Sequence, residues 1–328
     1  MKELIKTKNF ALIFSHQGPD GDSVGSSVAL SLYLSKIGVE NKIIFPDPYP
    51  HFLSWITGIN NSIVASENLE KVEQLYDASD LIFCLDFNHR SRVGKDLQEL
   101  ISRTNNKYIF VIDHHTHPEN FGNYEIIDEN ASSTAELIYK FIDSNNDLSL
   151  VDIPISEAIY TGIITDTGSF KYSSVTSTTH QIAAFLKDKG LNQVVIHDKI
   201  FDQNSVSKIN LLGYALQKIK IEESVSLALL FLTEKELNMF NYEKGDSEGF
   251  VNYCLSIKGI ENAVFLREDK DIIKISLRSK GKVKVNEFSS KFYEGGGHQN
   301  AAGAAVKNQD INTVVKELIQ NFKVFCSE

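Results

Sequence analysis

A chain of 328 residues is too long for one ordinary domain and long enough for two. Its composition, 42% hydrophobic and 23% charged, is typical of a globular protein with a full core, and no stretch approaches the roughly 18 apolar residues that a membrane span needs. The net charge of −10, with Lys and Arg scattered, argues against binding to long nucleic acid, because proteins that do so usually carry a dense basic stripe.

The N-terminal half alternates predicted strands with predicted helices. The first residues, MKELIKTKNF, lack the apolar core of about 7–15 residues that a signal peptide carries, so we expect a cytoplasmic protein. A helix is predicted from about 22 to 37, where Val24, Val28 and Leu32 recur at helical spacing. Near-continuous apolar runs of strand length are FALIFS (10–15), KIIF (42–45), LIFCLDF (81–87) and YIFVID (108–113).

Apolar runs of this kind are typical of the central strands of a parallel sheet that helices cover on both faces. The fold class that they predict is α/β, with a doubly wound, mainly parallel sheet in the N-terminal domain. Cys84 lies inside one run and is expected in the core, and the wide spacing of Cys84, Cys254 and Cys326 argues against a disulfide framework or a thiolate zinc site. Further helices are predicted at 132–145, 154–165 and 178–189.

The pattern changes in the C-terminal half, after a mostly helical and polar segment. The run at 271–279 alternates apolar and polar residues, as a half-exposed antiparallel strand does, and it follows a hairpin turn predicted at Asp269–Lys270. A glycine-rich segment, GGGHQNAAG (295–303), comes later. This half predicts a smaller α/β domain with a mixed or antiparallel sheet. Its other predicted elements are strands at 226–232 and 262–268 and a final amphipathic helix at 311–325.

Carboxylates and imidazoles gather at the ends of predicted strands. Because the carboxyl ends of parallel strands meet at one edge of a sheet, where ligands bind in such folds, we expect these side chains to lie together. Crowded carboxylates raise one another's pKa, and a divalent cation removes that repulsion. The clusters are His16, Asp20 and Asp22 in HQGPDGD; Asp86; Asp113, His114 and His115; and Asp166 in TDTGSF.

Each cluster taken alone has an interpretation without a metal. Asp20 and Asp22, in PDGD, would serve as turn residues or as a helix N-cap. A lone Asp113 or His114 after a strand would be a loop residue, and Asp166 would lie at the end of a helix. The joint pattern favours a metal centre, since every cluster falls where one centre would require it.

The candidate ligands are imidazoles and carboxylates without a thiolate, a set that favours Mn²⁺, Mg²⁺, Co²⁺ or Fe²⁺ over structural zinc. With two or more histidines, Mn²⁺ is the ion that we expect. The candidates exceed what one ion in an open site uses, so two ions that share a carboxylate are predicted. Two metals about 3.5–4 Å apart form the usual clamp for phosphoryl hydrolysis, because they activate water to hydroxide and stabilise the attacking and leaving oxygens.

Four motifs of the chain resemble, in order, the signature motifs of the DHH phosphoesterase superfamily: HQGPDGD, the isolated Asp86, DHH (113–115) and TDTGSF. The segment GGGHQNAAG resembles the glycine-rich motif of the DHHA1 domain, and together the motifs span nearly the whole chain. Length and arrangement resemble the nanoRNase / pAp phosphatase type of bifunctional oligoribonuclease. The resemblance implies a DHH catalytic metal-binding domain at 1–190, a helical linker at 191–220 and a DHHA1 substrate-binding domain at 221–328.

The resemblance also implies a role for each candidate residue. His115 would contact the substrate phosphate or the nucleophile, and Asp113 would orient a ligand histidine, as carboxylates beside metal sites often do. Asp86, Asp113 and His115 are thus the candidate catalytic residues. One Mn²⁺ would be bound by His16, Asp20 and Asp86, and the other by Asp22, Asp86, His114 and Asp166, with Asp86 bridging the two ions.

Candidate substrate contacts lie in the glycine-rich segment and in the strand before it. Glycine lets backbone N–H groups approach a phosphate closely, although no Gly-Lys-Ser/Thr follows as in a P-loop. Taken alone, the segment would be a turn and Arg278 a solvated strand end; Arg92 is a weaker candidate for phosphate binding. In the family context, the segment would face the metals across the interdomain cleft. The implied contacts are His115, Arg278, Ser279, Gly295, Gly296, Gly297 and His298.

The implied activity is Mn²⁺-dependent hydrolysis of very short RNA fragments, of linear dinucleotides such as pGpG and pApA, and of 3′-phosphoadenosine 5′-phosphate (pAp) to AMP. The expected partners are short RNA or a nucleoside bisphosphate, without long duplexes or membranes, and a homodimer is a family-level expectation. An exopolyphosphatase or pyrophosphatase-like hydrolase is one alternative, since it needs the metals but no base-binding surface. A non-catalytic nucleotide sensor is another, and the complete ligand set argues against it.

Overall fold

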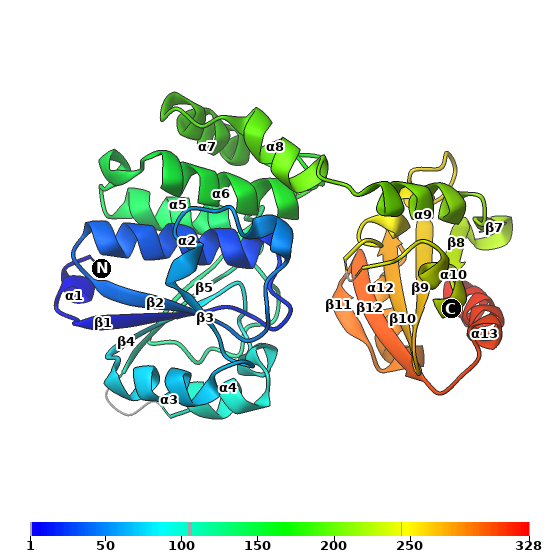
Figure 1. The fold of residues 1–328 in the computed structure, drawn as a ribbon, viewed down its shortest axis with the longest axis horizontal. Coiled ribbons are helices and arrows are strands. Elements are labelled where there is room, and N and C mark those ends of the chain that lie inside the picture. The colour runs from blue at the N-terminus through cyan, green and yellow to red at the C-terminus, as the bar shows by residue number, and fades with distance from the viewer. Residues whose placement is uncertain (1, 104–106, 244, 328) are drawn as a thin grey trace. The chain divides into compact units, whose positions relative to one another are not determined.

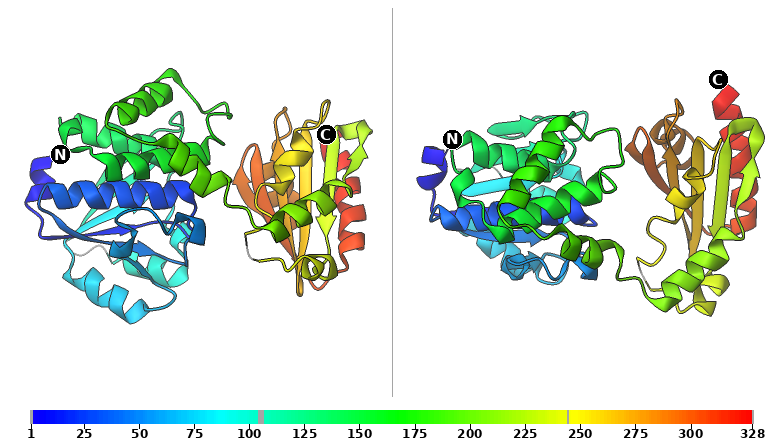
Figure 2. Two further views of the ribbon diagram at one scale, coloured as in Figure 1. Left: turned by 45° about the horizontal axis from the view of Figure 1, so that its top comes forward. Right: turned by 90° about the horizontal axis from the view of Figure 1, so that it is seen from above.

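The computed structural model describes residues 2–103, 107–243 and 245–327, without the side chain of His298. The chain forms two compact units, Met1–Gln203 and Asn204–Glu328, and each is described by itself. Figure 1 labels the helices and strands of both units, and Figure 2 shows them from two further directions.

The division between the units falls inside the segment predicted as a helical linker, and the helices of that segment pack on different units. Helix α8 (Gln193–Phe201) belongs to the N-terminal unit, where Ile196 enters its core. Helix α9 (Val206–Leu216) belongs to the C-terminal unit, where Leu211 is buried.

A six-stranded sheet in the order β3-β2-β1-β4-β5-β6 forms the centre of the N-terminal unit, and each neighbouring pair of strands is parallel. Every residue of β4 is buried, as the apolar run there predicts for a strand with helices on both faces. The predicted doubly wound α/β class is confirmed. The strands are β1 (Phe10–Phe14), β2 (Glu40–Phe45), β3 (Ser62–Val64), β4 (Leu81–Leu85), β5 (Tyr108–Asp113) and β6 (Tyr124–Ile127).

Helices cover both faces of this sheet (Figure 1). On one face, α2, α5 and α6 pack over a core that contains Phe83; on the other, α3 and α4 pack over a core that contains Cys84, as expected for that cysteine. Helices α7 and α8 lie outside α5 and α6 (Figure 2). The remaining bounds are α1 (Lys2–Lys6), α2 (Gly21–Lys36), α3 (Leu69–Ala78), α4 (Lys95–Ile101), α5 (Thr134–Ser144), α6 (Ile153–Asp166) and α7 (Ser177–Asp188).

The C-terminal unit contains a second six-stranded sheet, in the order β11-β12-β10-β9-β8-β7. Only the β8–β9 pair is parallel among the described pairings, so the sheet is mixed, as predicted. Helices α12 and α13 cover one face, and α9, α10 and α11 cover the other. The elements are β7 (Lys220–Glu222), β8 (Leu227–Leu232), α10 (Glu234–Met239), α11 (Phe250–Leu255), β9 (Asn262–Asp269), β10 (Ile272–Ser279), α12 (Val285–Tyr293), β11 (Gly296–His298), β12 (Ala301–Lys307) and α13 (Ile311–Ser327).

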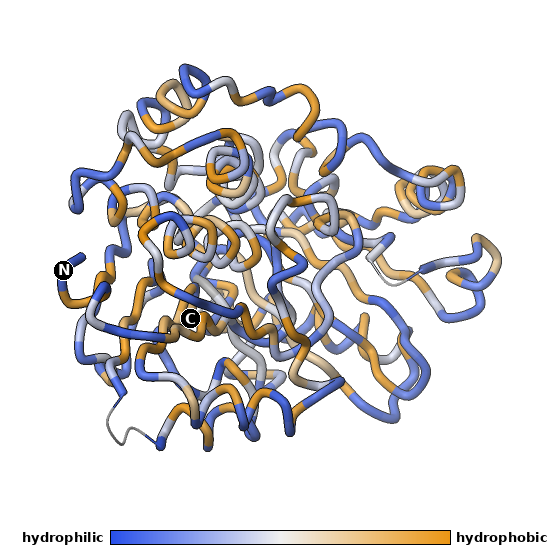
Figure 3. Tube along the Cα trace, turned by 60° about the vertical axis from the view of Figure 1, so that its left-hand side comes forward, coloured by the Kyte–Doolittle hydropathy of each residue, from blue (hydrophilic) through white to orange (hydrophobic). Residues whose placement is uncertain are grey.

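The described helices include none that is long and apolar enough to cross a membrane. Figure 3 agrees with this finding, because the colour of the chain changes between hydrophobic and hydrophilic at short intervals. Hydrophobic residues are instead spread over many short elements, which bury them in separate clusters on the faces of the two sheets.

Candidate metal centre

The candidate ligands of the N-terminal unit lie at the carboxyl edge of the parallel sheet, where the sequence predicts them. His16 follows β1, Asp86 follows β4, and His114 follows β5, and these three strands are neighbours in the sheet. Asp22 lies in the first turn of α2, and Asp166 is the last residue of α6. Segments that are distant in the sequence therefore bring carboxylates and imidazoles to one place.

Interatomic distances divide these side chains into sets that could each hold an ion. His16, Asp20 and Asp86 form one set, and Asp22, His114 and Asp166 form another; within a set the candidate ligand atoms lie within 4.8 Å of one another. His16 Nε2 is 3.2 Å from Asp86 Oδ2, and His114 Nε2 is 3.4 Å from Asp166 Oδ2. The structure thus brings together all six residues that the sequence proposes as ligands.

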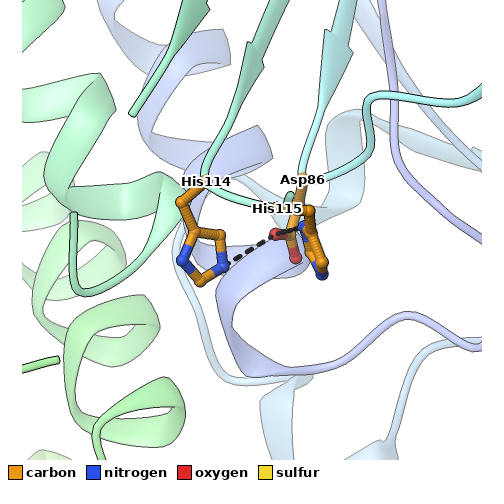
Figure 4. Close-up of side chains that lie close together, drawn as sticks. All are labelled: Asp86, His114 and His115. Atoms are coloured by element: carbon orange, nitrogen blue, oxygen red, sulfur yellow. Dashed lines mark ion pairs between the residues drawn. The ribbon is translucent and has the colours of Figure 1, made fainter. Parts of the chain in front are cut away.

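Asp86 lies between the two sets. Its Oδ2 faces His16, whereas its Oδ1 is 3.6 Å from His114 Nε2 and 3.8 Å from His115 Nδ1. Figure 4 shows both imidazoles beside this carboxylate. Asp86 also has a φ of 64°, a left-handed conformation that costs a non-glycine residue about 1–2 kcal/mol, and its amide donates a hydrogen bond to the Ile112 carbonyl (3.1 Å). The left-handed backbone conformation of Asp86 thus places its carboxylate between the two sets.

Asp20 combines a helix cap with a possible ligand. Its Oδ1 accepts hydrogen bonds from the backbone N–H groups of Asp22 (3.1 Å) and Ser23 (3.0 Å), which caps α2. Its Oδ2 lies 3.9 Å from His16 Nε2, and the side chain is 58% exposed. The N-cap interpretation of PDGD and the metal interpretation are therefore compatible, because they use different oxygens.

Glycines allow α2 and α6 to pack closely enough to bring Asp22 beside Asp166. A Cβ atom on Gly25 would lie 2.5 Å from the Ala158 carbonyl oxygen, and one on Gly162 would lie 2.7 Å from Asp22 Oδ1. Both distances are too short for any side chain. The pairing of these helices thus depends on residues that have no Cβ.

Asp22 is buried and is held by the N-terminal turn of α5. The backbone N–H of Thr134 donates to Asp22 Oδ2 (2.6 Å), and that of Ala135 donates to Oδ1 (2.9 Å). Sequence reasoning missed these contacts. The segment SSTAE does carry a helix-start signal, because Ser133 caps α5 by accepting a hydrogen bond from the Glu136 amide. The signal does not indicate that the first turn of this helix binds Asp22.

Asp113 orients His115 rather than His114. Oδ1 of Asp113 accepts a hydrogen bond from His115 Nδ1 (2.6 Å), and Oδ2 accepts one from the His115 amide (3.1 Å). His114, the histidine implied as a ligand, instead donates from Nδ1 to the Ala131 carbonyl (3.3 Å). Asp113 therefore supports His115, which forms a further group of candidate ligand atoms with Asp86 and His114, all within 4.8 Å of one another. The expected support of a ligand histidine by Asp113 stays a prediction.

The carboxylates of the centre repel one another. Burial, together with the charges of Asp86 and Asp166, raises the pKa of Asp22 well above its usual value. Burial and the charge of Asp86 also raise the pKa of Asp166, to about 7, against the opposing charge of His114. Divalent cations would relieve this repulsion, and the hard oxygen and imidazole donors suit Mn²⁺ or Mg²⁺. The residues present therefore fit a metal centre.

The shared carboxylate of Asp86 stays ionised in spite of its surroundings. Burial alone would raise its pKa, but the hydrogen bond with His16 and the charges of the nearby histidines hold the pKa below its usual value. Burial likewise opposes protonation of His16, yet Asp86 and Asp20 raise the His16 pKa to about 9. Without a cation, protons on His16 and His115 would balance part of the charge of the carboxylates.

The candidate substrate residues of the C-terminal unit lie in one row across three strands. Arg278 of β10 pairs with Ala301 of β12, which pairs with His298 of β11, although the His298 side chain lies outside the described part. Arg278 Nη1 donates to the Leu277 carbonyl (2.9 Å). Ser279 is buried, and its hydroxyl donates a hydrogen bond to the Val283 carbonyl (2.7 Å), so the hydroxyl proton is already used within the C-terminal unit.

The glycine-rich segment forms the edge of the sheet rather than an open loop. A Cβ on Gly295 would lie 2.3 Å from the Gly303 carbonyl oxygen, and one on Gly297, whose φ is 140°, would lie 2.4 Å from that of Ala301. Gly296 has nothing within 4 Å of its would-be Cβ. Two of the three glycines are therefore explained by tight pairing of β11 with β12, whereas a side chain at Gly296 would meet open space.

Comparison with known proteins agrees with both units. The family model "DHH family, N-terminal domain" matches residues 11–163, and the model "DHHA1 domain" matches residues 225–324. A solved structure of an exopolyphosphatase-related protein from Bacteroides fragilis is similar, with 36% identity and a TM-score of 0.95, and the match covers 99% of this chain and 96% of that one. The chain belongs to the DHH/DHHA1 phosphoesterase family.

Curated relatives are similar over most of their length. A protein of Thermus thermophilus named bifunctional oligoribonuclease and PAP phosphatase is 28% identical, and the match covers 94% of this chain and 87% of that protein. A protein of Bacillus subtilis with the same name is 27% identical, with coverage of 99% and 98%. The resemblance inferred from the motifs is thus confirmed at the level of the family.

Proposed function

We propose that this protein is a two-metal phosphoesterase that uses Mn²⁺ to hydrolyse short oligoribonucleotides, linear dinucleotides such as pGpG and pApA, and pAp. The observation that carries the proposal is the position of Asp86, whose two oxygens face two different sets of donors. The names of the Thermus thermophilus and Bacillus subtilis relatives support the substrate class.

Six side chains would hold the ions. Bound divalent metals would supply an activated water and would stabilise the charge that develops on the phosphoryl group. The buried position of Asp86 and Asp22 keeps competing water away from their oxygens. The first ion would be held by His16, Asp20 and Asp86, and the second by Asp22, Asp86, His114 and Asp166.

His115 is the residue that we assign to the substrate phosphate. Its Nδ1 donates to Asp113 Oδ1 (2.6 Å), which fixes the orientation of the ring. Burial lowers the pKa of His115, but the hydrogen bond with Asp113 and the charges of Asp86 and Asp113 outweigh it, and the pKa is raised. A histidine of raised pKa can donate a proton to a phosphate or leaving-group oxygen.

The row of Arg278 and the glycine-rich edge is the site that we assign to the rest of the nucleotide. A guanidinium group binds phosphate through two parallel hydrogen bonds, and a backbone N–H of the glycine-rich edge would add a further donor. Gly295 and Gly297 would shape that edge. Ser279 would support it through its bond to the Val283 carbonyl.

A substrate panel with purified protein tests the proposal. Release of AMP from pAp and of mononucleotides from pApA and pGpG is expected with Mn²⁺ and not with chelator. Asp86→Ala should abolish turnover while leaving the protein folded by circular dichroism. If no compound of the panel is hydrolysed at millimolar Mn²⁺, or if Asp86→Ala is fully active, the proposal is wrong.

A second candidate function is hydrolysis of polyphosphate or pyrophosphate. It is favoured by the exopolyphosphatase-related name of the Bacteroides fragilis protein, whose structure is similar over nearly the whole chain. Polyphosphate and pAp should be compared in the same assay. Preferential hydrolysis of polyphosphate, unaffected by Arg278→Ala, would favour this candidate over a nucleotide substrate. Binding of pAp without turnover of any compound would point to a nucleotide sensor instead.

A further inference from the structure

Thr134 connects two carboxylates of the metal centre that come from different elements. It is fully buried at the start of α5, and no sequence motif singles it out. Its backbone N–H donates to Asp22 Oδ2 (2.6 Å), and its hydroxyl donates to Asp86 Oδ1 (3.0 Å). One residue therefore sets the distance between a carboxylate of α2 and the carboxylate that follows β4.

The first turn of α5 is itself held firmly. Ser133 caps the helix by accepting from the Glu136 amide (3.1 Å). The buried carboxylate of Glu136 accepts hydrogen bonds from the hydroxyls of Ser132 (2.7 Å) and of Thr179 on α7 (2.8 Å). Because these hydrogen bonds fix the turn, we infer that the two donor groups of Thr134 keep their positions and hold the carboxylates of Asp22 and Asp86 in place.

Thr134 contacts carboxylate oxygens on the side of the metal centre where His114 lies. The Asp22 oxygen that it binds is 3.9 Å from His114 Nε2, and the Asp86 oxygen that it binds is 3.6 Å from the same atom. The other oxygen of Asp86 faces His16. Thr134 thus contacts only oxygens that face His114, among the contacts given by the described residues.

We propose that Thr134 is a positioning residue that raises the metal affinity of the set Asp22–His114–Asp166, which shares Asp86 Oδ1, and leaves that of the set His16–Asp20–Asp86, which uses Asp86 Oδ2, unchanged. This inference rests on the proposed two-metal function. The physical reason is that a carboxylate oxygen with one lone pair engaged by a fixed donor presents its other lone pair in a defined direction. Loss of the hydroxyl leaves the Asp86 carboxylate held at Oδ2 by His16 (3.2 Å), so the group can turn about that contact and the ion near His114 loses an oriented Oδ1.

The experiment measures Mn²⁺ binding directly, by the free-ion EPR signal or by calorimetry, and requires no turnover. Thr134→Val removes the hydroxyl with little change of volume. It is made in two backgrounds: Asp20→Ala, which weakens the His16 set, and Asp166→Ala, which weakens the His114 set. Thr134→Val should lower Mn²⁺ affinity about tenfold or more in the first background, a typical effect of losing a partner of a metal ligand, and should leave it unchanged in the second.

Two further variants separate orientation from packing. Thr134→Ser keeps the hydroxyl and should restore the affinity, and Thr134→Ala should show the same selective loss as Thr134→Val. Thr161→Val is the matched control, since Thr161 is equally buried on α6 and its hydroxyl has no hydrogen-bond partner among the described residues. It should bind Mn²⁺ as the wild type does.

Selective weakening with rescue by serine supports the inference. Equal loss of Mn²⁺ affinity in both backgrounds, or no loss in either, overturns the inference. The proposed function still stands in that case if the wild type binds two ions. If the wild type itself binds no Mn²⁺, the proposed function fails as well, so the two failures are distinguishable.

Discussion

Replacing Gly25 with alanine tests whether the close packing of α2 on α6 builds the metal centre. The added Cβ would lie 2.5 Å from the carbonyl oxygen of Ala158 and 2.8 Å from the amide nitrogen of Gly162. Both atoms belong to the backbone, so no side chain can turn aside. The two helices must separate, and Asp22, one turn before Gly25, moves with its helix.

The expected destabilisation is the difference of two effects. Overpacking of a core typically costs about 1–3 kcal/mol, whereas glycine to alanine in a helix interior contributes about 1 kcal/mol of stability. Since the clash at Gly25 is with backbone on two atoms, we expect the upper part of the first range and a net loss of about 1–2 kcal/mol. Gly213, on α9, is the matched control: its would-be Cβ has nothing within 4 Å, so alanine there should stabilise by up to about 1 kcal/mol.

Urea unfolding in the presence of chelator provides the measurement. The chain has one tryptophan, Trp55, which lies in the N-terminal unit, so its fluorescence follows the unfolding of that unit. Gly25→Ala should lower the midpoint of this transition and weaken Mn²⁺ binding, whereas Gly213→Ala should raise the midpoint seen by circular dichroism. A midpoint for Gly25→Ala equal to or above that of the wild type would refute the reasoning.

Metal addition, a site carboxylate and an acid titration provide three other tests. After removal of the chelator, Mn²⁺ at about 100 times its Kd should stabilise the protein by about 2.7 kcal/mol for each site that it fills, seen as a higher unfolding temperature; an unchanged temperature would contradict the metal centre. Asp113→Asn should lower kcat about 10- to 100-fold with little change in Mn²⁺ affinity, because Asp113 holds His115; a comparable loss of metal affinity would count against that role. Glu236 has a pKa lowered to about 2, since its hydrogen bonds, first with Lys218, outweigh burial, so the C-terminal unit should lose stability as pH falls from about 4.5 towards 2. Glu236→Gln should remove that pH dependence, and a variant with the wild-type acid profile would disprove the assignment.

The central strands and the candidate ligands could be predicted because the sequence encodes both locally. Apolar runs at 10–15, 81–87 and 108–113 correspond to β1, β4 and β5, and each is followed by a carboxylate or imidazole. Helix predictions at 132–145 and 311–325 fall on α5 and α13. Long buried elements carry a strong periodic or continuous pattern, and the sheet topology then brings their ends together.

Short edge elements and long-range polar contacts could not be predicted in this way. β3 and β6 are edge strands of half-buried residues, so they lack a continuous apolar run. β12 is largely alanine, a residue depleted in strands, and its pairing with β10 and β11 makes it a strand. The contact of Thr134 with Asp22 joins residues 112 positions apart, and backbone N–H groups leave no signature in a sequence.

The two oxygens of the Asp20 carboxylate have different partners, and this has a consequence for how the protein acquires its ions. One oxygen starts helix α2 by binding backbone N–H groups, and the other remains directed to His16. The cap of the helix therefore uses no oxygen that a cation beside His16 would need, in contrast to small zinc domains whose folding depends on the metal ligands. We expect the ions to exchange with the surrounding pool while the polypeptide keeps its shape, so that supply of the metal can regulate turnover without exposing the chain to degradation.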